Sequence, residues 1–284
     1  GSGAQPLGKM NLSPDYLRSI QNLVASPYGM VLAVGPTGSG KTTTLHAMLG
    51  KVNAVEKKVW TVEDPVEITQ PGLRQMQVNP QIGLSFSSAM RSFLRADPDV
   101  IMVGEMRDEE TAHMAVEASL TGHLVFSTLH TNNAPETVTR LIDMGMEPFS
   151  FSDALLAILA QRLARRLCDQ CKEEYEATDS ERSEFAGYLG ETALSRLAGT
   201  GPLKLFRAVG CVECDNSGYR GRLPLHELLV NNDEIREAIQ KKATTAELRL
   251  LAEKNGMRTL LQDGVAKCLQ GLTDLKQVLA VCSR

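Results

Sequence analysis

The stretch GPTGSGKT, Gly35–Thr42, decides the fold. A glycine, four further residues and then Gly-Lys-Thr form the pattern of a phosphate-binding loop. The apolar run Met30–Val34 precedes it and is typical of a buried strand, and the segment TTTLHAML that follows is predicted to be a helix. Strand, glycine-rich turn and helix in this order predict a nucleotide site, because backbone N–H groups and the helix dipole attract phosphate. A chance match would lack this flanking pattern.

The loop residues have different predicted roles at a bound ATP or ADP. Lys41 is expected to reach the β- and γ-phosphates, and the hydroxyl of Thr42 to ligate Mg²⁺. Glycines let the backbone turn so that successive N–H groups face one anion. The remaining candidate contacts in and beside the loop are Gly35, Thr37, Gly38, Ser39, Gly40 and Thr43.

Composition narrows the class of protein. The 284 residues allow one large domain or two modest ones, and 43% hydrophobic residues allow a sizeable core. A net charge of −4 and a pI near 5.8 argue against sequence-independent nucleic-acid binding, which usually needs a basic surface. No apolar run approaches the roughly 18 residues of a membrane span, and no signal peptide is visible. Six cysteines beside a nucleotide loop indicate a reducing compartment and metal binding.

Strands and helices alternate through the first half of the chain. Alternation of this kind predicts an α/β fold with a mainly parallel, doubly wound sheet. The predicted strands are Met30–Val34, Val59–Glu63, Arg74–Val78, Val100–Val103 and Leu124–Thr128, and the predicted helices between them are Ser87–Ala96, Asp108–Leu120 and Pro135–Met144. Beyond Arg222 we expect a short strand and four helices, roughly Asp233–Gln240, Thr245–Lys254, Thr259–Leu269 and Thr273–Val281.

The expected domain organisation follows from these elements. Residues 1–29 hold an opening GSG typical of a vector-derived addition, a linker and a leading helix. Residues 30–165 form the nucleotide-binding core, 166–222 a cysteine-containing module and 223–284 a C-terminal helical region.

Acidic residues follow two of the predicted strands. In TVEDPVE, Thr61–Glu67, a proline stops the strand, so the carboxylates lie at its C-terminal end, where ligands bind in open α/β sheets. A carboxylate such as Glu63 could activate water there or help to hold Mg²⁺. In DVIMVGEMRD, Asp99–Asp108, the apolar strand ends at Glu105, which could meet Mg²⁺ or the attacking water. The alternatives are an acidic turn facing solvent and a helix N-terminus without catalysis.

Two histidines flank a third strand, in GHLVFSTLHTNN, Gly122–Asn133. A lone histidine near a strand is usually a core or turn residue. His123 and His130 together, beside Ser127 and Thr128, are also typical of residues that sense a phosphate, and spacing alone leaves both interpretations open.

Two C-x₂-C pairs, CDQC and CVEC, are a strong zinc signature. Their cysteines are Cys168, Cys171, Cys211 and Cys214. The 39 residues between the pairs exceed the usual gap of roughly 15–20 residues, so an insertion is expected there. Four thiolates leave no open position, which predicts a structural rather than a catalytic site. The alternative is a pair of reduced, metal-free motifs.

These motifs together resemble the ATPases that drive type II secretion and type IV pilus assembly. GPTGSGKT is similar to the family's phosphate loop, TVEDPVE to its aspartate box, RSFLRADPDVIMVGEMRD to its Walker B segment and GHLVFSTLHTNNAPETVTRL to its histidine box. AQRLARRLC with CDQC, and then CVECDNSGYRGRLPLHELL, resemble the tetracysteine part of the secretion and pilus-extension branch. The resemblance runs from about Asn11 to the C-terminus.

The resemblance implies a RecA-like P-loop NTPase core and hydrolysis of ATP. By motif match, Lys41 and Thr42 would bind the phosphates and Mg²⁺, and Glu63 would be the better candidate for the catalytic base. Glu105 would support Mg²⁺ and water, although the family gives both acidic residues importance and the division of roles stays open. His123 and His130 would sense the γ-phosphate.

The resemblance also implies partners and a location. Family members form hexameric rings at the cytoplasmic face of the inner membrane and act on an inner-membrane platform protein and other components of the machinery. They carry a PAS-like domain before the core, which supplies arginines to the nucleotide, and almost nothing precedes Asn11 in this sequence. We therefore expect slow hydrolysis and weak assembly. Arg91 and Arg95 could lie near a phosphate or on a solvated helix face.

Two other classes of protein remain as alternatives. One is a nucleic-acid motor on the same kind of core, against which the acidic balance speaks, because such channels need positive grooves. The compact basic cluster RLARR, Arg162–Arg166, is expected to line a subunit contact or to orient the metal module. The other is a zinc-binding adaptor whose nucleotide site no longer catalyses, against which the intact Lys41, Thr42, Glu63 and Glu105 speak.

Overall fold

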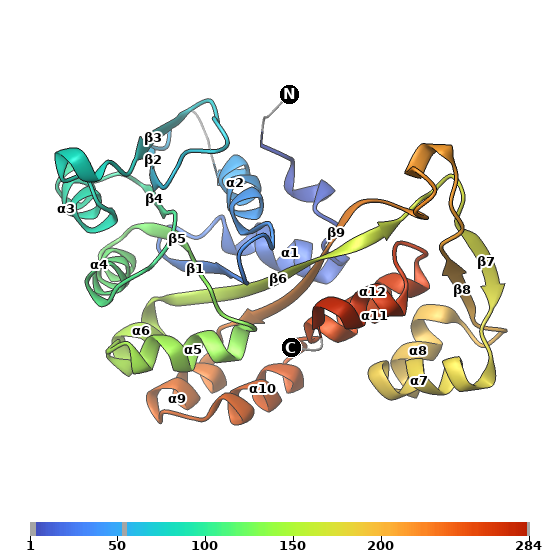
Figure 1. The fold of residues 1–284 in the computed structure, drawn as a ribbon. Helices are drawn as coiled ribbons and strands as arrows, with labels where there is room; N and C mark the ends of the chain where they lie inside the picture. The colour runs from blue at the N-terminus through green and yellow to red at the C-terminus, as the bar shows by residue number, and fades with distance from the viewer. Residues whose placement is uncertain (1–3, 53–55, 283–284) are drawn as a thin grey trace. The chain divides into compact units, whose positions relative to one another are not determined.

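A seven-stranded sheet organises the structure (Figure 1). The structure, a computed structural model, describes residues 4–52 and 56–282. Within these residues the strand order is β3-β2-β4-β5-β1-β6-β9, and all the pairs from β3 through to β6 are parallel. The strands are β1 Gly29–Val34, β2 Val59–Glu63, β3 Leu73–Gln77, β4 Val100–Val103, β5 Leu124–Leu129, β6 Leu155–Leu167 and β9 Tyr219–Val230. The predicted α/β fold with a mainly parallel sheet is confirmed.

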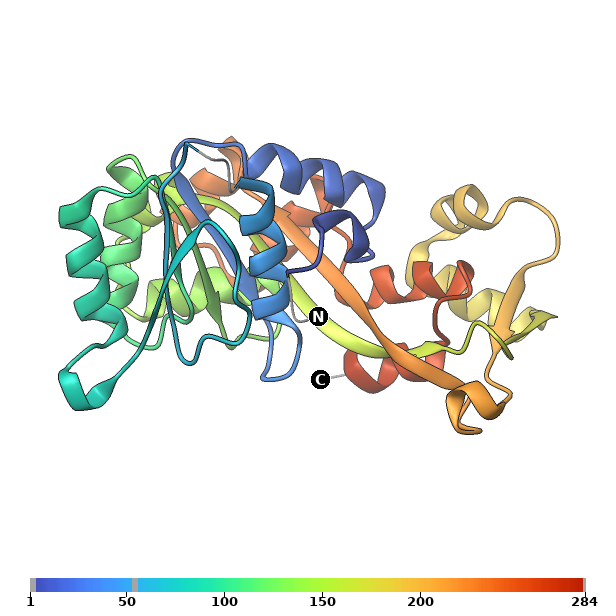
Figure 2. The same ribbon diagram turned by 90° about the horizontal axis from the view of Figure 1, so that it is seen from above.

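Helices cover both faces of the parallel strands (Figure 2). Helices α1 (Pro14–Leu23) and α2 (Lys41–Val52) share one hydrophobic core with alternate residues of the strands, among them Val31 and Ala33 of β1. Helices α3 (Phe86–Ala96) and α4 (Glu109–Leu120) pack against each other, and α4 lies on β1 and β5. Strands buried on both faces explain why they are continuous apolar runs in the sequence.

Four more helices belong to the same compact unit, which comprises the chain up to Gln161 together with Leu228–Met257. They form two packed pairs, α6 with α9 and α5 with α10. Hydroxyl groups join the second pair, because Oγ1 of Thr139 lies 2.8 Å from Oγ1 of Thr245. These helices are α5 Ala134–Asp143, α6 Pro148–Ala154, α9 Asp233–Gln240 and α10 Thr245–Lys254.

A second unit comprises Arg162–Glu227 and the chain from Arg258. Its two-stranded antiparallel sheet pairs β7 with β8, and α11 packs against α12 and α7 (Figure 1). Its elements are β7 Glu173–Glu176, α7 Asp179–Leu189, α8 Glu191–Ala198, β8 Lys204–Arg207, α11 Leu260–Leu269 and α12 Leu275–Cys282. Short 3₁₀ turns lie at Leu7–Lys9, Pro80–Ile82 and Val212–Cys214. No helix of the described residues is long and apolar enough to cross a membrane.

The structure groups the C-terminal residues differently from the expected region 223–284. Helices α9 and α10 belong to the first unit, whereas α11 and α12 belong to the unit that contains the cysteines. The boundary expected near residue 165 lies between Gln161 and Arg162. The short strand expected after Arg222 is the 12-residue β9, which begins at Tyr219, and the 13-residue β6 was not predicted.

Buried charges explain why α11 belongs with β9 rather than with α9 and α10. Nζ of Lys267 on α11 donates to Oδ2 of Asp263 at 2.8 Å and to the carbonyl of Pro224 on β9 at 2.6 Å. The same Oδ2 accepts the backbone N–H of His226 at 2.8 Å. Both charged side chains are 3% exposed. Burial lowers the pKa of Lys267, and the attraction of Asp263 opposes that effect.

We expect Asp263→Ala to destabilise the protein by about 3–5 kcal/mol, because it leaves the Lys267 ammonium buried without its counter-charge. Urea unfolding followed by circular dichroism measures the change; the single tryptophan, Trp60, lies in the other unit and would not report it directly. The matched control is Glu237→Ala, which removes an exposed i,i+4 pair with Lys241. Equal losses in the two variants would contradict the importance of burial.

Candidate functional site

Four strands deliver polar residues to one edge of the sheet. The phosphate loop follows β1, Glu63 ends β2, Glu105 comes two residues after β4, and His130 follows β5. Because these strands are parallel, their carboxyl ends meet at the same edge. A pocket lies there, lined by Lys41, Thr42, Glu63, Asp64, Pro65, Glu67, Phe86, Met102, Gly104, Glu105, Arg107, Thr128 and His130.

The phosphate loop is held from behind by a glutamine of β6. Nε2 of Gln161 donates to the carbonyl of Ser39 at 2.7 Å, and its Oε1 accepts from Oγ1 of Thr44 at 2.6 Å. Gly38 and Gly40 adopt φ values of 82° and 84°, which favour glycine. A Cβ on Gly35 would lie 2.6 Å from the carbonyl of Gln161, so the first glycine is required for this close approach. These contacts hold the backbone of the phosphate loop against β6.

A histidine links the loop lysine to the acidic residue after β4. Nζ of Lys41 donates to the carbonyl of Gly35 at 2.7 Å and lies 2.8 Å from Nδ1 of His130. Nε2 of His130 pairs with Glu105. An ammonium can only donate and a carboxylate can only accept. Nδ1 of His130 therefore accepts and Nε2 donates, which is the arrangement of a neutral imidazole.

An arginine lies over the acidic side of the pocket. Nε of Arg107 donates to Oε2 of Glu105 at 2.6 Å, and its NH1 group donates to Oδ2 of Asp64 at 3.0 Å. Its guanidinium also lies 5.1 Å from the ring centroid of Phe86. The hydrogen bond to Glu105 raises the pKa of Arg107, partly opposed by burial and reinforced by Asp64. The side chain of Arg107 is half exposed.

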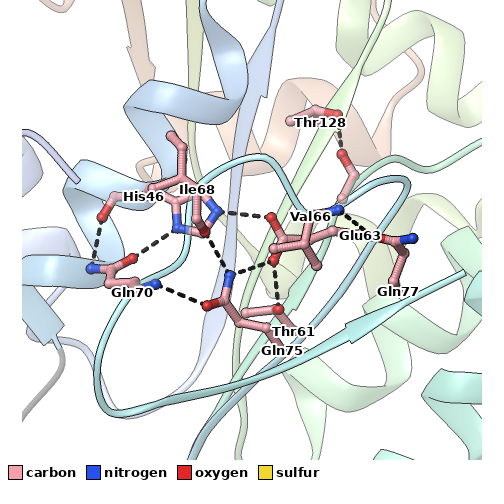
Figure 3. Close-up of polar contacts among 10 residues, drawn as sticks. His46, Thr61, Glu63, Val66, Ile68, Gln70, Gln75, Gln77 and Thr128 are labelled. Atoms are coloured by element: carbon pink, nitrogen blue, oxygen red, sulfur yellow. Dashed lines mark hydrogen bonds and ion pairs between the residues drawn. The ribbon is translucent and has the colours of Figure 1, made fainter. Parts of the chain in front are cut away.

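Glu63 is almost completely buried and is one of the residues that line the pocket, and Figure 3 shows the polar contacts of its carboxylate. Its Oε1 lies 2.8 Å from Nε2 of His46, and its Oε2 accepts from Thr61 at 2.8 Å and Gln75 at 3.0 Å. Burial by itself would raise the pKa of Glu63, but the hydrogen bonds from His46, Gln75 and Thr61 outweigh it and lower that pKa. Glu63 is therefore an oriented carboxylate at neutral pH.

The structure does not bring His123 to this pocket. His123 precedes β5 and His130 follows it, so the two lie at opposite ends of one strand. Nδ1 of His123 lies 3.0 Å from the carbonyl of Ala118, and its Nε2 lies 3.2 Å from Asp97. The prediction that both histidines sense one γ-phosphate is therefore not supported within a single chain, and His123 occupies a buried turn.

The two arginines of α3 lie on a solvated face. Arg91 pairs with Glu110 of α4 with about half of each side chain exposed, and Arg95 is exposed. Neither lines the pocket. Arg107, which sequence reasoning did not single out, is the arginine that reaches the site.

Sequence reasoning also missed His46, Gln70, Gln75 and Gln161. His46 falls within the segment TTTLHAML, five residues after Lys41, where a histidine on a helix gives no signal of its partner. The glutamines come from the loop between β2 and β3, from β3 and from β6, and only the fold brings them to the site.

The four predicted cysteines converge in the second unit. Their sulfur atoms all lie within 4.8 Å of one another. The Sγ–Sγ distances are 3.8 Å for Cys168–Cys211, for Cys171–Cys214 and for Cys211–Cys214. Tetrahedral zinc with Zn–S bonds of about 2.3 Å requires an S···S spacing of about 3.8 Å. The residues therefore fit a four-coordinate metal ion.

Backbone N–H groups donate hydrogen bonds to two of these sulfur atoms and favour their thiolate form, which binds a cation. Those of Cys211 and Gly218 each lie 3.2 Å from Sγ of Cys214, and that of Gly210 lies 3.3 Å from Sγ of Cys171. Burial raises the pKa of Cys214, but these backbone donors outweigh it and bring the pKa to about 6. Burial raises the pKa of Cys171 to about 11, against the donor from Gly210. Metal binding must therefore displace protons.

Two arginines of the basic cluster RLARR contact other residues of the second unit. Arg162 is buried, with its Nε 3.3 Å from the carbonyl of Val281. The guanidinium of Arg165 lies 4.4 Å from the ring centroid of Tyr219, five residues after Cys214. The expectation that the cluster lines a subunit contact or orients the metal module stays a prediction.

The phosphate loop, the acidic residues beside it and the parallel sheet define a P-loop nucleotide-binding protein with a RecA-like core. The family model described as "Type II/IV secretion system protein" matches residues 4–280. The chain belongs to this family. The resemblance to the ATPases of type II secretion and type IV pilus assembly, which the motifs indicated, is confirmed.

The chain is similar to a type IV pilus assembly ATPase, PilB of Thermus thermophilus, with 47% identity over 95% of the chain and 30% of that protein. It is similar to a type II secretion system ATPase E of Vibrio cholerae, with 48% identity over 93% of the chain and 50% of that protein. Among solved structures it is similar to the pilus retraction motor PilT with bound ADP, with a TM-score of 0.72, 28% identity, and coverage of 99% of this chain and 68% of the other.

The chain thus spans half or less of the length of these two curated relatives. The fold class predicted from the sequence is confirmed by these likenesses.

We expect metal analysis of the reduced protein to find about one zinc per chain. Cys211→Ser should lower that stoichiometry and destabilise the second unit, because a serine hydroxyl is a poor replacement for a thiolate ligand. Cys268→Ser is the matched control, since Cys268 lies on α11, outside the cluster. Full zinc content in the Cys211 variant, or none in the reduced wild type, would contradict this expectation.

Proposed function

We propose that the chain is the catalytic part of an ATPase motor that drives assembly of a pilus or of a secretion pseudopilus. The observation that carries the proposal is the meeting of a buried lysine, two carboxylates and a neutral histidine around one pocket beside a phosphate loop. The names of the relatives, a pilus assembly ATPase and a type II secretion ATPase, support the client class. The ADP bound in the PilT structure supports the proposal that this chain binds an adenine nucleotide.

The loop supplies the grip on the phosphates. Lys41, already fixed by Gly35 and His130, would contact the β- and γ-phosphates, and backbone N–H groups from Gly35 to Thr43 would surround them. Oγ of Ser39 is buried without a hydrogen-bond partner among the described residues, which fits a hydroxyl that a ligand satisfies. Thr42 would ligate Mg²⁺, which when bound neutralises charge between the phosphates.

Glu63 is the better placed of the two carboxylates to act as the base. It is buried, ionised and held by three side chains, so its orientation toward the pocket is fixed. Glu105 instead pairs with His130 and Arg107, and its carboxylate would support Mg²⁺ and the water next to it. His130 contacts both Lys41 and Glu105 and would register the presence of the γ-phosphate.

The proposal also covers the oligomeric state of the protein and its location in the cell. We infer a homo-hexamer that acts from the cytoplasm at the inner membrane on a platform protein and other components of the machinery. Zinc in the four-cysteine cluster would be structural, since four sulfur ligands leave no position open for water. Nucleic acid is not among the proposed partners, because the net charge of the chain is −4 and a sequence-independent nucleic-acid binder usually needs a basic surface.

We expect Lys41→Ala to weaken binding of a fluorescent ATP analogue and to reduce ATP hydrolysis by at least about 100-fold, because a fixed positive charge at the phosphates is lost. Glu63→Gln should retain binding but lower kcat by about 10²–10⁴. The control is Lys51→Ala, an exposed lysine on the same helix.

Equal hydrolysis by the wild type and the Lys41 variant would refute the proposal. Stimulation by single-stranded DNA would favour a nucleic-acid motor, and tight nucleotide binding without turnover in a reconstituted hexamer would favour a zinc-binding adaptor.

A further inference from the structure

His46 lies directly behind Glu63 and contacts it from the helix that begins at the phosphate loop. The side chain of His46 is fully buried on the second turn of α2 (Figure 3). Its Nε2 lies 2.8 Å from Oε1 of Glu63, and its Nδ1 lies 2.7 Å from Oε1 of Gln70. His46 does not line the pocket itself, so it can act on a ligand only through Glu63.

The neighbours of His46 determine where its protons are. Nε2 of Gln70 donates to the backbone carbonyl of His46 at 3.3 Å, so the amide oxygen of Gln70 faces the imidazole ring. The other ring nitrogen faces a carboxylate, which accepts hydrogen bonds. Both nitrogens of His46 therefore donate, and the ring is an imidazolium.

The opposite side of Glu63 keeps the negative charge on that residue. Gln75 accepts the backbone N–H of Gln70 at 2.9 Å, and its Nε2 donates both to the carbonyl of Ile68 at 2.8 Å and to Oε2 of Glu63 at 3.0 Å. With Thr61 also donating to this oxygen, two hydrogen bonds stabilise the carboxylate. The shared proton therefore stays on His46 rather than on Glu63.

We propose that His46 is a positioning residue, a buried imidazolium that fixes the carboxylate of Glu63 at the phosphate pocket. This inference rests on the proposed function, in which Glu63 is the base. One helix, α2, then carries both Lys41, which grips the phosphates, and the group that aims the base at them. Helix α2 therefore fixes the position of Glu63, through His46, relative to the position of Lys41.

The pair has a defined pH range. Burial lowers the pKa of His46, but the hydrogen bonds that His46 donates to Glu63 and Gln70 and the attraction of Glu63 and Glu67 outweigh it and raise that pKa above its usual 6.5. Among the residues that the structure describes, Glu63 and Glu67 are the charged groups whose attraction acts on this pKa. The stabilisation by His46 is complete below pH 6.5 and is lost as the pH rises through the raised pKa. The stabilisation by Glu63 is complete above pH 4.5, the usual pKa of a glutamate, and it is lost as the pH falls through the lowered pKa of Glu63.

Nitrogen NMR of the histidine rings tests the charge state in the intact chain without any need for hydrolysis. At pH 6.5 we expect protons on both ring nitrogens of His46, with the signal assigned by its loss in His46→Gln. In Glu63→Gln the pKa of His46 should fall. One unprotonated ring nitrogen in the wild type at this pH would overturn the proposal, and this measurement needs no variant except for assignment.

The pH profile of ATP hydrolysis tests the positioning role. We expect His46→Gln to lower kcat by up to about 100-fold, the size expected for a slightly misplaced reacting group, while the KM for ATP changes little. The wild type should lose kcat on the alkaline side as His46 titrates, and that limb should be absent in His46→Gln. His113→Gln is the matched control, because His113 is an exposed histidine paired with Glu109.

These experiments distinguish a failure of the positioning role of His46 from a failure of the proposed ATPase function. A His46→Gln variant with wild-type kcat and an unchanged alkaline limb would overturn the positioning role while leaving the ATPase proposal intact. An inactive wild type would remove the proposed function, and the NMR result would still decide whether the His46–Glu63 ion pair exists.

Discussion

The register of the parallel strands is the constraint on which the site depends. Val34 at the end of β1 pairs with Leu129 of β5, and Val103 of β4 pairs with Ser127 of β5 and Val62 of β2. These pairings bring the ends of four strands to one level, so residues from distant parts of the sequence share one pocket. A shift of one residue in any of these pairings would move its side chains to the opposite face.

Two histidines of the site differ in protonation, so that one is neutral and the other is positively charged. His130 lies between an ammonium and a carboxylate, so its ring accepts at one nitrogen and donates at the other. His46 lies between two acceptors and donates at both nitrogens. The carboxylate of Glu63 is therefore neutralised by a buried neighbour, whereas Glu105 is paired with the half-exposed Arg107. Environment thus gives two similar carboxylates different roles.

Local sequence patterns predicted the parts of the fold that depend on short-range chemistry. The phosphate loop, the buried strands and the C-x₂-C pairs are recognisable because their residue types are required at fixed spacing, as at Lys41 and Cys168. Strand β6 was missed because LLAILAQRLARRL is rich in leucine, alanine and arginine, which favour helices, and tertiary pairing with β1 overrides that propensity. His46 and Gln161 were missed because their partners lie on other strands, and no local spacing encodes them.

The cysteine module shows how a long insertion is compatible with a compact metal site. The 39 residues between Cys171 and Cys211 contain β7, α7, α8 and β8, and pairing of β7 with β8 brings the ends of the insertion together. Closing a loop of this length costs conformational entropy that grows only slowly with length, and the paired strands already meet most of that cost. The backbone N–H groups around Cys214 then favour thiolate, so the protein itself supplies both the spacing and the charge that a tetrahedral ion requires. The metal would therefore lock an arrangement that the fold has already assembled.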